Sequence, residues 1–119
     1  MRPRLRRSAE FQLVYTQGRK HVGAEFVLFH LQDAADRRVA FVASRKVGGA
    51  VQRNRAKRVL RAALTEVLRG KPDAAPGWVV LVARREILAH TSVDVARALR
   101  ALFESESPGA TPPGDEERP

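Results

Sequence analysis

Residues 44–61 constrain what this chain can fold into and bind more than any other stretch. They leave an apolar segment, pass through two consecutive glycines and open a helix whose first turns are crowded with cations. At 3.6 residues per turn, one side of this helix is an apolar stripe that must face a core: Ala56, Leu60, Ala63, Leu64 and Val67. The pattern therefore predicts a helix over about residues 51–69 with one buried and one basic face.

The basic face lies at the unfavourable end of the predicted helix. Cations near a helix N-terminus oppose the helix dipole, and neighbouring like charges repel one another. A bound phosphate would relieve both penalties, because unpaired backbone amides and cationic side chains meet there. A merely solvated basic face is the alternative, but the clustering favours phosphate binding by the following side chains: Arg53, Asn54, Arg55, Lys57, Arg58 and Arg61.

The overall charge indicates a polyanionic partner. The 119 residues carry a formal net charge of +9, although residues 104–119 hold five acids and only one arginine. Residues 1–103 therefore carry the larger excess, which favours nucleic acid as the partner. The chain has no cysteine, which excludes disulfides, thiolate zinc sites and cysteine nucleophiles. The apolar run 78–83 is too short to span a bilayer, and no secretory signal is evident, so we expect a cytoplasmic protein without a membrane partner.

Periodicity predicts the element order α-β-β-β-α-β-α. The first helix covers about residues 9–17; strands follow at 19–22, 25–31 and 38–44; and a strand over 78–83, expected at the centre of the sheet, follows the basic helix. A final helix, capped by Thr91 or Ser92, buries Val95, Leu99, Leu102 and Phe103. This order predicts an α+β two-layer sandwich with its helices on one face of a mixed sheet.

The predicted domain organisation is simple. Residues 1–103 form a single RNA-binding domain, in which residues 1–7 are a basic flexible arm that Leu5 can anchor. Residues 104–119 are acidic, rich in proline, glycine and serine, and lack apolar periodicity, so we expect a disordered tail. The three histidines, His21, His30 and His90, are scattered along the chain, and we expect no chemical role for them.

These residues resemble the protein subunit of bacterial ribonuclease P. The resemblance rests on Arg53-Asn54-Arg55, followed by Lys57-Arg58 and Arg61 and preceded by residues 44–48 and 50–51. It extends over about residues 4–103 and includes Phe11, Tyr15, Gly18 and residues 26–29. The resemblance implies a ribosomal-protein-S5-like fold with a left-handed β-α-β crossover from the third to the fourth strand. It also implies an endoribonuclease ribonucleoprotein in which RNA and bound Mg²⁺, not this chain, perform the hydrolysis that removes the 5′ leader of precursor tRNA.

The resemblance also implies residue roles. Phe11, Tyr15 and Phe29 match the aromatics of a cleft for the single-stranded leader, and Arg45 and Lys46 match a basic pair at a strand end. The helix side chains listed above match the motif that contacts the catalytic RNA. The sequence departs from the family at Gly49, where asparagine is usual, and at Phe29, which lacks a hydroxyl often found there. Phe11 and Phe29 remain open to a second interpretation, as core residues.

Two rival functions remain at this point. A protein nuclease would need clustered carboxylates or a histidine pair, and the acids of residues 1–103 occur one at a time. A ribosomal or general RNA-chaperone protein with a basic RNA-binding face fits the composition equally well, and only the Arg-Asn-Arg motif in its context argues against it. We expect ribonuclease P RNA and precursor tRNA as partners, no DNA, no metal site in the chain itself, and a monomer in the absence of RNA.

Overall fold

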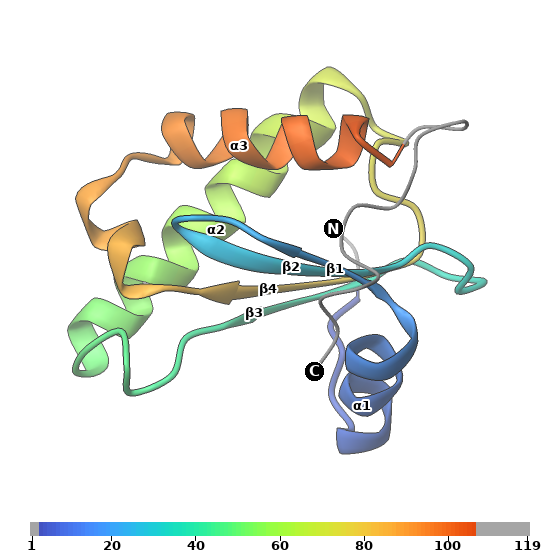
Figure 1. Ribbon diagram of the computed structural model, residues 1–119, viewed down its shortest axis with the longest axis horizontal. Coiled ribbons are helices and arrows are strands. Elements are labelled where there is room, and N and C mark those ends of the chain that lie inside the picture. Colours follow the sequence, from blue (N-terminus) through green and yellow to red (C-terminus); the bar gives the residue numbers. More distant parts are fainter. Residues whose placement is uncertain (1–2, 107–119) are drawn as a thin grey trace.

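A computed structural model describes residues 3–106 of the chain (Figure 1). Its elements confirm the predicted order, with one addition, the 3₁₀ helix η1 between the fourth strand and the last helix. In chain order they are α1 (Ser8–Gln17), β1 (Arg19–Val22), β2 (Phe26–Leu31), β3 (Arg38–Val42), α2 (Ala50–Gly70), β4 (Trp78–Ala83), η1 (Arg85–Ala89) and α3 (Ser92–Glu104).

The four strands form one mixed sheet in the order β1-β2-β4-β3. β1 and β2 are antiparallel, β2 and β4 are antiparallel, and β3 and β4 are parallel, with Val80 opposite both Phe29 and Ala40. β4 therefore lies in the interior of the sheet, as its uninterrupted apolar sequence predicts. β3 and β4 are neighbours joined through α2, which is the β-α-β crossover that the resemblance implies.

The sheet buries both faces, but unequally. α2 and α3 cover one face, whereas α1 lies on the other (Figure 1). The α2–α3 face holds the larger core, which includes Phe26, Leu28 and Leu81, and the α1 face holds a smaller one around Val14 and Val80. The prediction that all helices share one face is thus wrong for α1. The physical reason is visible in β2, whose alternate side chains are apolar on both sides and need cover on each.

The rotation of α2 about its axis is fixed by its apolar stripe. The buried residues of α2 are the predicted five: Ala56, Leu60, Ala63, Leu64 and Val67. Small side chains at 56 and 63 allow close approach of neighbouring elements, and each buried leucine contributes about 1.5–3 kcal/mol to folding. α3 packs against α2 with the following residues: Val95, Ala96, Leu99 and Phe103. Thr91, one of the two predicted caps, accepts a hydrogen bond from the Asp94 amide at 3.3 Å and begins α3.

The first described residues are held against the sheet. The Leu5 amide donates to the Val39 carbonyl at 3.1 Å, the Val39 amide donates to the Pro3 carbonyl at 3.0 Å, and the Leu5 side chain is buried. The amides of Arg6 and Arg7 donate to a Glu10 carboxylate oxygen, which lowers the pKa of Glu10. The prediction of a flexible arm is therefore wrong for residues 3–7, apart from the anchoring role of Leu5; residues 1–2 lie outside the described part.

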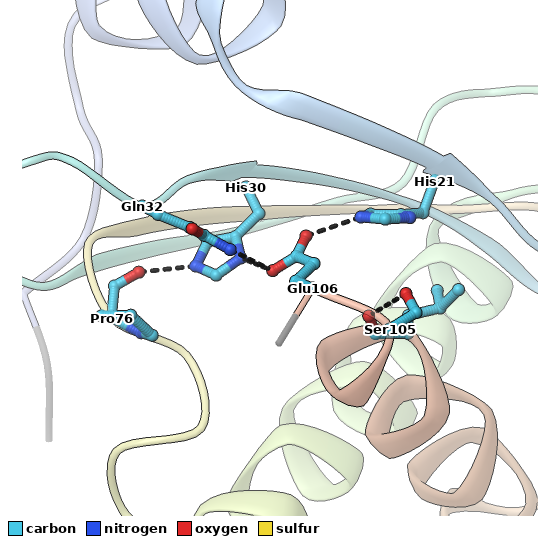
Figure 2. Close-up of polar contacts among 7 residues, drawn as sticks. His21, His30, Gln32, Pro76, Ser105 and Glu106 are labelled. Atoms are coloured by element: carbon cyan, nitrogen blue, oxygen red, sulfur yellow. Dashed lines mark hydrogen bonds and ion pairs between the residues drawn. The ribbon is translucent and has the colours of Figure 1, made fainter. Parts of the chain in front are cut away.

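A buried carboxylate closes the other end of the domain. Glu106 follows α3, and its side chain is only 2% exposed. Its carboxylate accepts from His21 Nε2 at 2.6 Å, from His30 Nδ1 at 2.5 Å and from Gln32 Nε2 at 2.8 Å (Figure 2). We call Glu106 with His21, His30 and Gln32 the C-terminal clasp. It corrects the predicted boundary of the disordered tail, because Glu104 to Glu106 belong to the folded domain; residues 107–119 of that tail lie outside the described part.

The clasp holds a buried carboxylate among three polar side chains. Burial alone would raise the pKa of the Glu106 carboxyl, but the hydrogen bonds from His21, His30 and Gln32 outweigh it and lower the pKa from 4.5 to about 2. His30 Nε2 lies 2.5 Å from the Pro76 carbonyl, so both ring nitrogens of His30 face acceptors. Both ring nitrogens of His30 are thereby engaged, which fixes the orientation of the ring. Nothing in the sequence pattern links positions 21, 30 and 106, which only the fold brings together.

We expect Glu106→Gln to destabilise the domain by roughly 1–3 kcal/mol at pH 7, because the substitution removes the buried carboxylate that accepts from His21, His30 and Gln32. The folded-state pKa is depressed, so this stability is present above about pH 4.5 and is lost as the pH falls toward 2. Urea unfolding of both proteins from pH 7 to 3 measures the difference, which should narrow on acidification. Glu104→Gln, on an exposed side chain two residues earlier, should change little. Equal stability of Glu106→Gln and wild type at pH 7 would contradict the clasp.

Candidate nucleic-acid interface

Most of the predicted basic side chains of α2 lie outside its buried stripe, although Arg53, in the first turns, lies close to the edge of the stripe. Asn54, Arg55 and Arg58 are exposed, and Arg53, Lys57 and Arg61 are half-buried. Within residues 3–106, no carboxylate lies within salt-bridge distance of any of these cations. The first turn of α2 contains no acid, and the N-cap position is Gly49, which has no side chain to cap the helix amides. This α2 basic cluster therefore combines free guanidinium groups with uncapped backbone N–H groups, a combination suited to phosphate oxygens.

A compact turn places a second pair of cations just before α2. The Val47 amide donates to the Ser44 carbonyl at 3.0 Å, and the Val47 side chain is buried. Arg45 and Lys46, between these two anchors, are exposed. The turn depends on Gly48, whose φ of 149° is rarely adopted by other residues and whose missing Cβ would lie 2.9 Å from the Cβ of Gln52. Arg45 and Lys46 are thus displayed beside the start of α2.

The three predicted aromatics form one cluster between α1 and β2. Tyr15 packs edge-on to Phe29 with ring centroids 4.8 Å apart, and Phe11 lies 6.2 Å from Tyr15. Tyr15 is 38% exposed, and burial of the rest of its ring raises the pKa of the phenol, so the hydroxyl remains a donor at neutral pH. Phe11 and Phe29 are half-buried and pack on the smaller core. The interpretations of these rings as leader-cleft aromatics and as core residues therefore both hold in part, because the cluster packs on the core on one side and is open to solvent on the other.

Sequence reasoning missed Lys20 as a site residue, and it missed the contact that the predicted residue Arg61 makes with an aromatic ring. Lys20 Nζ lies 5.9 Å from the centre of the Phe29 ring, beside the aromatic cluster. The Arg61 guanidinium lies 5.3 Å from the centre of the Phe41 ring. The alternation of β1 could have placed Lys20 on the α1 face, since it pairs with Phe29 in the sheet. The contact between α2 and β3 had no signal in the sequence.

The predicted residues fall into three groups, two of which belong to elements on opposite faces of the sheet. The aromatic cluster lies on the α1 face, and the α2 basic cluster belongs to the helix that covers the other face (Figure 1). Arg45 and Lys46 lie in the turn that leads from β3 to α2.

The described residues do not suit a catalytic metal centre. Between residues 3 and 106, no three histidine or carboxylate side chains are grouped so that they could hold an ion. Acidic and histidine donors that do meet, as in the C-terminal clasp, are already paired with each other at hydrogen-bond distance.

In the same part of the chain, none of the helices has the length and apolar character needed to cross a membrane.

Comparison with known proteins identifies the family. A model of the ribonuclease P family matches residues 1–106. The chain belongs to the ribonuclease P protein family. The ribonuclease P protein component of an Exiguobacterium species is 37% identical over 101 residues, which cover 84% of this chain and 86% of the relative. The ribonuclease P protein component of a Nitratiruptor species is 46% identical over 85 residues, which cover 71% of this chain and 73% of the relative.

Solved structures of the family share the fold. The RNase P protein of Thermotoga maritima superimposes with a TM-score of 0.67 at 26% identity, covering 87% of this chain and 96% of that chain. The RNase P protein of Staphylococcus aureus superimposes with a TM-score of 0.67 at 20% identity, covering 90% of this chain and 97% of that chain. The predicted family and the α+β fold are thus confirmed. The general function of ribonuclease P is processing of the tRNA 5′ end, and a protein component implies an RNA partner.

We expect Gly48→Ala to destabilise the domain by roughly 1–3 kcal/mol, because the new methyl group meets Gln52 and the backbone is held at a positive φ. Gly49→Ala is the matched control: Gly49 has a φ of −74° and only the flexible Gln52 amide nearby. Urea unfolding measures both variants. A loss for Gly48→Ala no larger than that for Gly49→Ala would show that the turn tolerates a side chain at this position.

Proposed function

We propose that this protein binds the catalytic RNA of ribonuclease P through the α2 basic cluster and holds the 5′ leader of precursor tRNA on its aromatic cluster. In this way it assists the endonucleolytic cut that produces the mature tRNA 5′ end. The observation that carries the proposal is a set of cations in the first turns of α2, where the helix is uncapped, with no carboxylate partner within residues 3–106. Such a set is unfavourable unless an anion binds.

The α2 basic cluster fits the backbone of a folded RNA. An arginine guanidinium can donate two parallel hydrogen bonds to two oxygens of one phosphate, and this contact does not depend on the base sequence. Lys57 adds a point charge, and Asn54 adds an amide that can donate to and accept from RNA groups. Because the buried stripe fixes how α2 is rotated, these groups are positioned before RNA arrives, which lowers the entropic cost of binding.

The aromatic cluster fits an unpaired strand of varied sequence. Every base has a flat face that can stack on the exposed part of Tyr15, whose orientation is set by Phe29 and Phe11. Lys20 beside Phe29 and the exposed pair Arg45 and Lys46 offer positive charge to the phosphates of such a strand. Stacking on these rings tolerates any base, which suits a leader that differs from one tRNA precursor to the next.

The chemistry of the cut is assigned to the RNA partner. The chain has no cysteine, and the carboxylates and histidines of residues 3–106 form no group that could hold a metal ion. We expect Mg²⁺ to be held chiefly by the RNA. The role of the protein is then positioning and neutralisation of charge, so no catalytic residue is assigned to it. We further propose that it acts in the cytoplasm and is a monomer before it meets RNA.

Cleavage of a precursor tRNA at low Mg²⁺ by a bacterial ribonuclease P RNA tests this function. We expect a correctly placed 5′ cut that is strongly stimulated by the protein and that is largely lost with Arg53, Arg55 and Arg58 replaced by alanine. The control variant replaces Arg85, Arg97 and Arg100, three exposed arginines outside α2, and so removes the same charge. Absence of stimulation by the folded wild-type protein would favour a ribosomal or chaperone role. Equal losses in both triple variants would indicate a general charge effect.

We expect Tyr15→Ala to weaken binding of precursor tRNA to the holoenzyme by about tenfold, since one base stack is worth roughly 1–3 kcal/mol. Binding of mature tRNA, which has no leader, should be unchanged. Leu13→Ala is the matched control, because Leu13 is 37% exposed on the same helix but carries no ring. Equal effects of Tyr15→Ala on both RNAs would exclude a contact with the leader.

A further inference from the structure

A slot of about 440 Å³ lies where α2, β3 and the first described residues meet. Its floor is apolar and consists of Val39 and Phe41 from β3 with Leu64 and Leu68 from α2. Its rim carries Thr65 and three arginines, which come from three separate turns or segments of the chain: Arg4, Arg61 and Arg69. We call this the α2–β3 slot. None of the family-implied roles above includes it, although Arg61 is shared with the α2 basic cluster.

The contacts of the N-terminal segment explain how the slot is built. Pro3 and Leu5 bond to Val39 along the outer edge of β3, and Leu5 is buried in the smaller core on the α1 face. Side chains alternate along an extended chain, so Arg4 is turned to the opposite face, where α2 lies. Arg4 thereby forms one wall of the slot, and the ordered arm is a part of the site.

The slot offers an aromatic platform with positive charge above it. The Phe41 ring is half-buried, and the Arg61 guanidinium lies 5.3 Å from its centre. Arg69 pairs with Glu66 at 3.0 Å, whereas Arg4 and Arg61 have no ion-pair partner within residues 3–106. No acid lines the slot. An apolar floor beneath unpaired guanidinium groups is complementary to a flat, apolar-faced ligand that carries negative charge.

We propose that the α2–β3 slot takes one unpaired nucleotide of the ribonuclease P RNA, with its base against Phe41 and Leu68 and its phosphates at Arg4 and Arg61. This proposal rests on the proposed function and deepens it. Aromatic and arginine planes are the surfaces on which proteins hold splayed-out RNA bases. Arg61 makes the slot continuous with the α2 basic cluster, so one RNA can occupy both.

Filling the slot without removing any charge tests the proposal. Thr65→Trp places an indole at the exposed rim, and we expect about tenfold weaker binding of ribonuclease P RNA. The slope of binding against salt concentration should fall at most by the phosphate contacts at Arg4 and Arg61, because the rest of the α2 basic cluster is untouched. Ala101→Trp, at an exposed position on α3, is the matched control and should bind normally. Phe41→Leu removes the platform while keeping an apolar side chain, and it serves as a second variant should Thr65→Trp unfold.

A crosslink identifies the occupant directly, because the chain has no cysteine of its own. Thr65→Cys carrying a photoactivatable group should crosslink to an unpaired nucleotide of ribonuclease P RNA in the holoenzyme, whereas Ala101→Cys should not. A crosslink to the precursor tRNA instead, or to paired positions only, would overturn the assignment. So would normal binding by both Thr65→Trp and Phe41→Leu, or equal losses in Thr65→Trp and Ala101→Trp. If the wild-type protein neither binds the RNA nor stimulates cleavage, the proposed function itself fails, and the slot proposal fails with it.

Discussion

The packing of the α2 apolar stripe against the sheet is the interaction on which the rest of the structure depends. Leu60, Leu64 and Val67 are almost wholly buried, and the small side chains at 56 and 63 let neighbouring elements approach closely. A helix fixed along one face has no freedom to rotate, so its opposite side is fixed as well. The α2 basic cluster is therefore held in a set arrangement toward solvent by hydrophobic burial rather than by any contact of its own.

The two faces of the sheet have different roles: one stabilises the fold, and the other presents an aromatic surface. The α2–α3 face is a closed core, sealed at its end by the C-terminal clasp, and it provides most of the buried apolar surface. The α1 face is only partly covered, so Tyr15 stays accessible and Phe29 only half-buried. A single sheet thus supports a stable core on one side and an open aromatic surface on the other, because β2 carries apolar side chains toward both.

Several features were predictable because their signals are local. The stripe of α2, the alternation of β2, the apolar run of β4 and the capping of α3 each depend on residues within a few positions of one another, and the structure confirms all four. The placement of α1, the order in residues 3–7 and the folded position of Glu106 were predicted wrongly. Each of these depends on a partner far away in sequence, such as Val39 for Leu5 and His30 for Glu106.

The sequence alone determined the family, the order of the elements and which side of α2 is basic, since spacing along the chain encodes periodicity and motif. Only the tertiary structure decided which distant groups meet: His21 with Glu106, Arg61 with Phe41, and Arg4 with the rim of the α2–β3 slot. The physical reason is that such contacts depend on strand order, register and the angle at which α2 crosses the sheet. These quantities are set by the packing of the whole domain, and no single segment of the sequence carries them.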